Sequence, residues 1–222
     1  MATYGDMIER INDELLLNGD YNTQIPRAIQ TAIKHYEKTR FRFNHGRATT
    51  TLAPDFEYQE PPPDMIEEDE LMLIDGTERR PLNKRTYLWI GNQSRDLNYR
   101  ARPTDYAIET DDLRLYPIPD AAYTLQLSYL KSLPTLVALT DTNAWMNDGE
   151  ELIRLRSKRI MLEDYLRGPE SFAEAERLKK REEGDPLTGE RGVLGALKDE
   201  WKRLASHDML MPFGFPGDCT ER

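Results

Sequence analysis

Cysteine is almost absent from this chain, which has one at Cys219. A single thiol excludes an intrachain disulfide and any zinc site built from clustered cysteines. The three histidines, His35, His45 and His207, have no partner at metal-ligand spacing, and there is no His-Glu-x-x-His motif. The sequence therefore predicts no metal centre and no cofactor.

Motifs of catalysis and of nucleotide binding are missing as well. The chain has no Gly-x-Ser-x-Gly, no phosphate loop and no Gly-x-Gly-x-x-Gly after a strand. The carboxylates of residues 64–70 could bind a divalent cation, but a contiguous acidic run is usually a solvated loop. No side chain stands out as a nucleophile or a general base, so we expect a protein that is not an enzyme.

Long hydrophobic runs are also absent. No apolar stretch approaches the ~20 residues that a membrane-spanning helix needs, and the N-terminus lacks the basic and apolar blocks of a signal peptide. These absences predict a soluble protein that is made in the cytoplasm and has no membrane partner. Because hydrophobic residues make up only 38% of the chain, we expect a small core and a surface that is completed by neighbouring subunits.

Charge is plentiful, and it is segregated along the chain. The formal net charge is −10, and the ten acidic residues between Asp55 and Glu78 are followed by a basic stretch from Arg79 to Arg102. Two solvated loops of opposite sign would explain this pattern. Alternatively, the two patches meet between copies of the chain in a ring. The candidate residues for such contacts are Glu67, Glu68, Asp69, Arg79, Arg80 and Arg85.

Three helices are indicated by apolar residues at helical spacing. The first is capped by Thr3 and ends near residues 18–19, and the second is capped by Thr23 and runs on toward Phe43, before a stop at residues 44–46. The third runs from Glu150 to residue 168, and we expect these three to form a small antiparallel bundle. Residues 170–183 also favour a helix, but they have few apolar anchors, which predicts a solvated helix or one that lies on a neighbour.

Between these helices, period-two spacing predicts an inserted antiparallel β-sheet over residues 47–131, and therefore an α+β fold. Residues 48–52 and 106–108 favour strands, and residues 71–82 favour a hairpin that turns at Asp75-Gly76. Residues 86–90 fit either a strand or a short helix capped by Asn83. Residues 113–115 and 123–129 have the spacing of a hairpin, with a stiff turn at residues 116–120 that contains two prolines.

Several of these segments resemble one protein family, the head-to-tail adaptor (connector) proteins of tailed bacteriophages. The similarity covers roughly residues 3–167 and rests on structural residues. The residues that carry it lie in the opening helices, in the central strands and at the start of the third helix: Thr3-Tyr4-Gly5-Asp6, Ile25-Pro26, Leu113-x-Leu115-x-Pro117-x-Pro119-Asp120, Ser128-Tyr129-Leu130-Lys131-Ser132-Leu133-Pro134 and Thr142-Asn143-x-Trp145.

The resemblance implies a structural protein of the virion, located at the head–tail interface after synthesis in the host cytoplasm. In this family, copies form a ring, expected here to have 12 members, that docks beneath the portal protein and joins the capsid to the tail (nozzle or tail-completion) proteins. DNA would be only cargo, passing through an axial channel. An acidic subunit suits such a channel because it repels phosphate.

This reading divides the chain into an adaptor body, residues 1–183, and a C-terminal segment, residues 184–222. In the body, helices from residues 1–46 and 143–183 surround the β-rich insertion. The C-terminal segment is expected to hold a linker, a short amphipathic helix and an extended tail. The tail is rich in large apolar side chains but is broken by proline and glycine, so we expect it to dock on a partner, with the portal favoured. The expected docking residues are Trp201, Met209, Leu210, Met211, Phe213 and Phe215.

A second interpretation is a soluble nucleic-acid-binding module. It would use the basic residues 79–102 and a basic face of the second helix. That face would be formed by Arg27, Lys34, Lys38, Arg40 and Arg42. A solvated face or a subunit contact would produce the same pattern, and a module of this kind would require salt-sensitive affinity of the isolated protein for DNA.

Overall fold

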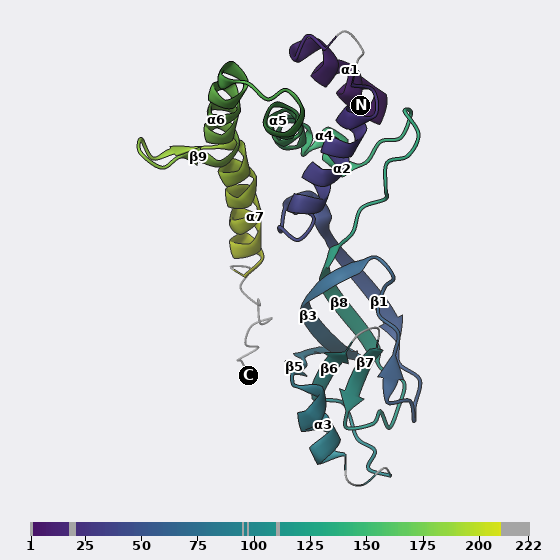
Figure 1. The fold of residues 1–222 in the computed structure, drawn as a ribbon. Helices are drawn as coiled ribbons and strands as arrows, with labels where there is room; N and C mark the ends of the chain where they lie inside the picture. Colours follow the sequence, from purple (N-terminus) through teal and green to yellow (C-terminus); the bar gives the residue numbers. More distant parts are fainter. Residues whose placement is uncertain (1, 18–20, 95, 97, 110–111, 210–222) are drawn as a thin grey trace, which may run out of the picture. The chain divides into compact units, whose positions relative to one another are not determined.

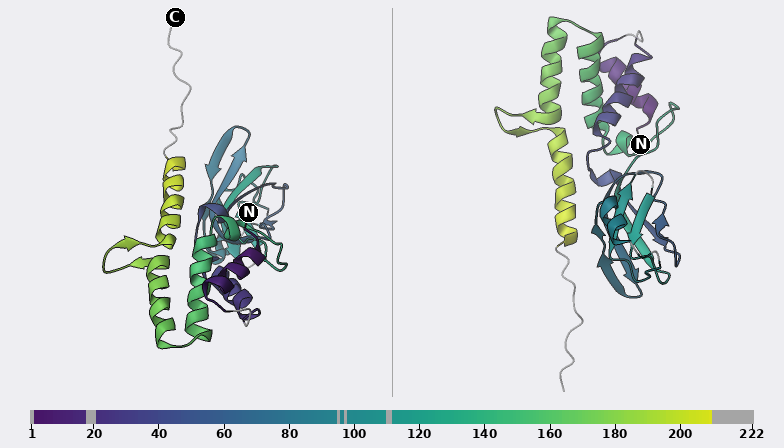
Figure 2. Two further views of the ribbon diagram at one scale, coloured as in Figure 1. Left: turned by 90° about the horizontal axis from the view of Figure 1, so that it is seen from above. Right: turned by 60° about the horizontal axis from the view of Figure 1, so that its bottom comes forward.

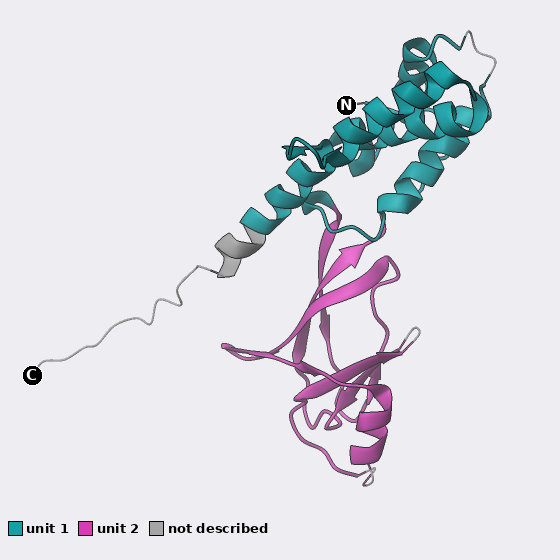
Figure 3. Ribbon diagram, turned by 60° about the vertical axis from the view of Figure 1, so that its left-hand side comes forward, with its two compact units in different colours: residues 1–43, 134–222 teal, residues 44–133 magenta. Residues whose placement is uncertain are grey.

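The computed structural model describes residues 2–17, 21–94, 96, 98–109 and 112–209. The chain divides into two compact units, residues 1–43 with 134–222 and residues 44–133 (Figure 3). We call the first the helical unit and the second the β unit. Together they contain helices and mainly antiparallel sheets, so the expected α+β class is confirmed.

The helical unit is formed by two separate stretches of the chain (Figure 1). A 3-10 turn, η1 (Arg42–Asn44), leads from it to the β unit. Its described elements are α1 (Tyr4–Glu14), α2 (Gln24–Tyr36), α4 (Ala144–Asn147), α5 (Glu150–Ile160), the π-helical turn η2 (Met161–Tyr165), α6 (Pro169–Glu183), the short strands β9 (Gly184–Asp185) and β10 (Glu190–Arg191), and α7 (Val193–Met209).

The first two helices are shorter than the sequence suggested. α1 ends at Glu14, where the chain turns through Leu16 with a φ of 53°. α2 ends at Tyr36, because the chain leaves the helix and places Phe41 in a buried aromatic cluster, 5.7 Å from the ring of Trp145. Residues 44–46 therefore do not stop a helix, and His45 and Gly46 open a strand instead.

The two predicted N-caps behave differently. Thr3 forms a full capping box, in which its hydroxyl accepts from the Asp6 N–H at 3.1 Å while the Asp6 carboxylate accepts from the Thr3 N–H at 2.8 Å. Thr23 precedes α2, but its hydroxyl donates to the side chain of Gln24 and caps no backbone group.

This contrast gives a prediction with a built-in control. Thr3→Ala should lower the free energy of unfolding by about 1 kcal/mol, because the Asp6 N–H loses the hydroxyl that accepts its hydrogen bond at the helix start. Thr23→Ala, at the same position of the next helix, should change it by a few tenths of that at most. Urea denaturation of both variants checks the difference. Equal losses would mean that the capping box contributes nothing specific.

The α6 helix is exposed over most of its surface, as expected, but one face of it packs against its own chain. Ala175 and Leu178 are buried against Leu155 and Leu162 of the α5–η2 segment, and Val193 at the start of α7 joins the same cluster. The sparse apolar residues of α6 suffice because they fall on the one face that meets α5. Phe172, a large apolar residue of the same helix, is half exposed.

The segment between α6 and α7 was expected to be a linker, and it is a short β-hairpin. β9 and β10 pair antiparallel, and their turn projects at the junction of α6 and α7 (Figure 2). Gly184 and Gly189 adopt positive φ values of 102° and 72°, which glycine allows at little cost. The separation of residues 184–222 as a docking segment stays a prediction.

A buried ionic cluster joins α2, α5 and α6. Glu182 is fully buried, and it accepts a hydrogen bond from the Tyr36 hydroxyl. Arg159 lies 3.1 Å from the Glu182 carboxylate and 2.9 Å from that of Glu183. Burial raises the pKa of Glu182, and the Tyr36 hydrogen bond and the charge of Arg159 oppose this rise. The cluster therefore holds three helices together only while its charges are paired.

The β unit contains two four-stranded sheets rather than one. Their strand orders are β1-β8-β3-β4 and β2-β7-β6-β5, and the β5–β6 pair is parallel. The strands are β1 (His45–Thr51), β2 (Tyr58–Gln59), β3 (Met65–Asp75), β4 (Glu78–Pro81), β5 (Asn83–Lys84), β6 (Asp105–Glu109), β7 (Asp112–Tyr116) and β8 (Thr124–Lys131), and the helix α3 (Tyr87–Gln93) precedes β6.

The expected central hairpin is wrong, although both of its strands exist. β7 pairs with β2 and β6, whereas β8 pairs with β1 and β3, so the proline-containing segment after Tyr116 crosses from one sheet to the other. Apolar alternation shows that a strand has one buried face, but it does not choose the neighbouring strand. That face is as expected, because Leu115 of β7 and Leu125 of β8 lie in one core cluster with residues of both sheets.

Two further expectations are settled in this unit. Residues 87–90 belong to a helix, α3, and its cap is Thr86, whose hydroxyl accepts from the Trp89 N–H at 3.2 Å. Asn83 lies in β5 instead. The acidic run is not a loop, because Glu67 to Glu70 belong to β3 and pair with β8 through two irregularities of register. The Asp75-Gly76 hairpin between β3 and β4 is confirmed.

Candidate partner-binding surfaces

The charged residues expected to meet between subunits are largely paired within the β unit. Lys84 forms an ion pair with Glu68, whose side chain is only 8% exposed. Arg80 lies 2.7 Å from Glu78, and Arg85 lies 2.8 Å from Asp105. Glu68 and Arg85 thus serve contacts inside the unit, and Glu68 ties β3 of one sheet to β5 of the other.

The remaining members of that set differ in environment. Asp69 lies 3.6 Å from His45, across the sheet that contains β1 and β3. Glu67 and Arg79 are exposed on β3 and β4. Glu67, Asp69, Arg79 and Arg80 therefore keep side chains near the surface, and their role between subunits stays a prediction.

The expected docking residues lie at the end of the described chain. Trp201 is half-buried on α7, and Met209 is the last residue of that helix. Leu210, Met211, Phe213 and Phe215 lie outside the described residues. α7 is longer than the short helix that the sequence suggested, because its pattern continues from Val193 to Met209.

A surface rich in aromatic side chains and arginine surrounds α3 on the β unit, and the sequence reasoning had not identified it. It consists of two groups of contacting side chains, one around Arg114 and one around Trp89, and the helix α3 contributes to both. We call it the α3 surface and define it by Tyr58, Arg85, Tyr87, Leu88, Trp89, Tyr99, Arg114 and Tyr116.

Arg114 organises one half of the α3 surface. Its guanidinium lies 4.9 Å from the ring centre of Tyr87 and 5.8 Å from that of Tyr58, and it forms an ion pair with Glu57. The two tyrosine hydroxyls are 3.3 Å apart. This hydrogen bond, with burial and the charge of Glu57, raises the pKa of Tyr58 to about 12. Tyr58 therefore stays neutral at physiological pH.

The other half is built on Trp89. The guanidinium of Arg85 lies 4.9 Å from the Trp89 ring, which meets Tyr116 edge-on at 6.2 Å. Tyr99 lies 6.3 Å beyond, with 49% of its surface exposed, and Leu88 is 74% exposed. Rigid aromatic side chains with arginine are typical of the centres of protein–protein interfaces. Because carboxylates neutralise both arginines, the surface suits a protein better than a phosphate backbone.

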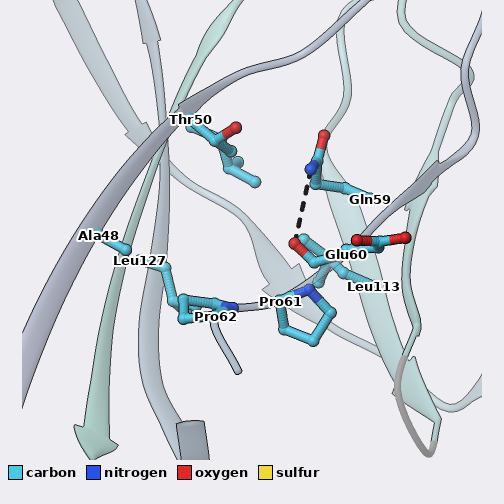
Figure 4. A pocket seen from close by; sticks show the side chains of 9 residues that line it. Ala48, Thr50, Gln59, Glu60, Pro61, Pro62, Leu113 and Leu127 are labelled. Carbon is cyan, nitrogen blue, oxygen red and sulfur yellow. Dashed lines mark hydrogen bonds between the residues drawn. The ribbon is translucent and has the colours of Figure 1, made fainter. Parts of the chain in front are cut away.

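A groove runs between the edges of the two sheets. β1 ends one sheet and β2 ends the other, and among the described residues β1 pairs only with β8 and β2 only with β7. A cavity of about 300 Å³ opens between them. Figure 4 shows Ala48, Thr50 and Leu127 across this cavity from Gln59 and Leu113.

A second cavity of about 140 Å³ shares Gln59 with the first, and we call the two together the seam groove. The residues that line the first cavity are Ala48, Thr50, Leu113, Leu125, Leu127 and residues 59–62, and those that line the second are residues 51–53, Phe56, Tyr58 and Gln59. The groove is thus lined by aliphatic side chains of β1, β7 and β8 and by residues of the connections before and after β2.

Other classes of site find little support in the described part of the chain. No group of three or more His, Cys, Asp or Glu side chains there could hold a metal ion. No described helix is both long and apolar enough to cross a membrane. The basic face expected on the second helix is not continuous, because α2 ends before Lys38, and Arg42 lies 3.2 Å from Glu200 and 3.8 Å from Asp148.

Comparison with known proteins identifies the family of the chain. A search of curated proteins gives no match. A sequence model of the family described as SU10 adaptor protein matches residues 2–182. The match spans α1 to α6 and the whole β unit, well over half of the chain, and it leaves out α7 and the C-terminal segment. The chain therefore belongs to the SU10 adaptor protein family, a family of phage head-to-tail adaptors.

Proposed function

We propose that this protein is a structural subunit of a ring that docks beneath the portal protein, joins the capsid to the tail and leaves a channel for DNA. The observation that carries the proposal is the family match over residues 2–182. Family membership gives a phage adaptor, which is structural rather than enzymatic, and implies contact with portal and tail proteins. The ring, its 12 copies and its channel are the proposed part.

Two features of the molecule support a role in assembly. The α3 surface exposes the large side chains of Tyr58, Leu88 and Tyr99 to solvent. Exposed apolar patches of this kind mark sites of protein–protein contact. We assign the α3 surface to the contacts that hold the assembled ring. The C-terminal segment, with Trp201 and residues 209–215, is proposed as a docking segment that orders on a partner, because prolines and glycines disfavour a helix there.

The proposal predicts assembly on a template. Light scattering should report a monomer or weak association for the pure protein, because its surface is polar and strongly acidic, and a complex with added ring mass when purified portal protein of the same virus is mixed in. Leu88→Asp, which puts a charge in the α3 surface, should fold normally and give at least tenfold weaker assembly. Thr77→Asp, at the exposed turn between β3 and β4, is the matched control.

Two outcomes would count against these assignments. No mass increase with portal protein would contradict the adaptor function of the ring. A stable large ring formed by pure protein at micromolar concentration would contradict assembly on a template and would leave the adaptor role intact. Equal assembly of the Leu88→Asp and Thr77→Asp variants would remove the α3 surface from the interface.

A further inference from the structure

The seam groove has the features of an acceptor for an extended peptide. In a strand, successive residues direct their N–H and C=O groups alternately to the two sides. Alternate residues of β1 therefore direct these groups away from β8, and the described residues provide no strand on that side. Beside this open edge lies the apolar cavity, which is lined in part by Leu113 and Leu125. An added strand would form hydrogen bonds with the backbone groups of this edge and would fill the cavity with its side chains.

The same sequence contains a segment whose pattern matches such an acceptor. Large apolar side chains alternate at Met211, Phe213 and Phe215, just beyond the end of α7 at Met209. In an extended conformation these three side chains share one face. A six-residue strand spans about 20 Å, and residues 48–53 of the groove's β1 side are equally long.

The prolines of the segment allow one edge of an added strand to pair with β1 and prevent its other edge from pairing with a further strand. Pro212 and Pro216 lack the backbone N–H. Both alternate with Met211, Phe213 and Phe215, so in a strand their backbone groups point to the opposite edge. All the residues whose side chains face the groove therefore keep a donor for β1. The opposite edge has only Gly214 as a donor, so the added strand would end the sheet rather than recruit another chain.

We propose that residues 211–216 of one copy bind as an added strand along β1, in the seam groove of a neighbouring copy. The proposal rests on the proposed function, because it requires neighbours in a ring. A closed ring needs two different surfaces that meet head to tail, and this segment and this groove supply both halves from one sequence. The sequence alone favoured the portal as the partner of this segment, whereas in this proposal its partner is the neighbouring copy of the chain.

Cross-linking between marked chains tests the proposal. In a Cys219→Ser background, Thr50→Cys is placed in one chain and Phe213→Cys in another chain that carries a mass tag. Both are mixed, assembled on portal protein and treated with a short bifunctional maleimide. We expect a cross-linked pair with one chain of each kind. Thr49→Cys, on the same strand but exposed and outside the groove lining, should give at least tenfold less product.

Each alternative has its own signature. A chain with both Thr50→Cys and Phe213→Cys that cross-links within itself would show that the segment occupies its own groove, and it would overturn the proposal. Cross-linking of Phe213→Cys to the portal instead would overturn it too. The mass of the complex, measured before cross-linking, distinguishes failure of the groove contact from failure of the proposed function. If a complete ring forms without the Thr50–Phe213 product, only the groove contact is contradicted. If no ring forms, the proposed function is contradicted as well.

Discussion

Deletion of residues 210–222 should leave the melting temperature within about two degrees of the full-length protein and abolish assembly on the portal. Among the described residues, the core cluster of the β unit is built from residues 48–129, and a core cluster of the helical unit is built from Leu15, residues 155–178 and Val193, so we expect both to form without the deleted segment. Three alternating apolar anchors, each worth about 2 kcal/mol or more as interface hot spots, would weaken association by far more than a hundredfold when removed.

The control for this deletion is a shorter one. Removing only residues 218–222 takes away the sole cysteine and the charged end but keeps Met211, Phe213 and Phe215. This variant should melt and assemble like the full chain, with calorimetry and light scattering as the two readouts. A collapse of the melting temperature in the longer deletion would place the segment in the protein's own core, and normal assembly would show that it binds no essential partner.

Arg159→Met should destabilise the helical unit by about 3 kcal/mol, because the buried charge of Glu182 loses its closest partner and keeps only Arg156, at 3.5 Å. Glu182 is fully buried, and Arg159 is both its close counter-charge at 3.1 Å and nearly buried itself, with 7% of its side chain exposed. Methionine keeps the aliphatic part of the packing, so the decrease in the free energy of unfolding measures the effect of removing the guanidinium charge. Denaturant unfolding measures it.

The loss should depend on pH with a definite sign. Without Arg159, the native pKa of Glu182, already raised by burial, rises further above its value in the unfolded chain. The native state then binds more protons than the unfolded state between those two pKa values, so stability falls as the pH rises above about 4.3. The variant should therefore be closer to wild type at pH 5 than at pH 7.

Two further variants make this test specific. Arg159→Met combined with Glu182→Gln removes both charges and should recover much of the lost stability. Arg177→Met breaks an exposed pair with Glu174 on the same helix, where the arginine side chain is 80% exposed, and should leave the melting temperature unchanged. If Arg159→Met behaves like Arg177→Met, the buried cluster has no structural role.

Features that depend on neighbours in the chain could be predicted from the sequence. Thr3 caps the first helix because its side chain reaches the backbone N–H three residues away. Asp75-Gly76 forms the expected turn, since glycine takes the required positive φ of 60°. The apolar faces of β7 and β8 follow from alternation alone. The family resemblance rests on the same local residues, and the family match supports it.

Features that depend on distant residues were decided only by the tertiary structure. The alternation in β7 and β8 is the same whether they pair or lie in different sheets, because it records burial and not the partner. Tyr58 meets Tyr87, and Trp89 meets Tyr116, although these residues are far apart in the sequence, so no local pattern predicts the α3 surface. Glu182 is polar in sequence, yet it is buried because Tyr36 and Arg159, from two other helices, supply its partners.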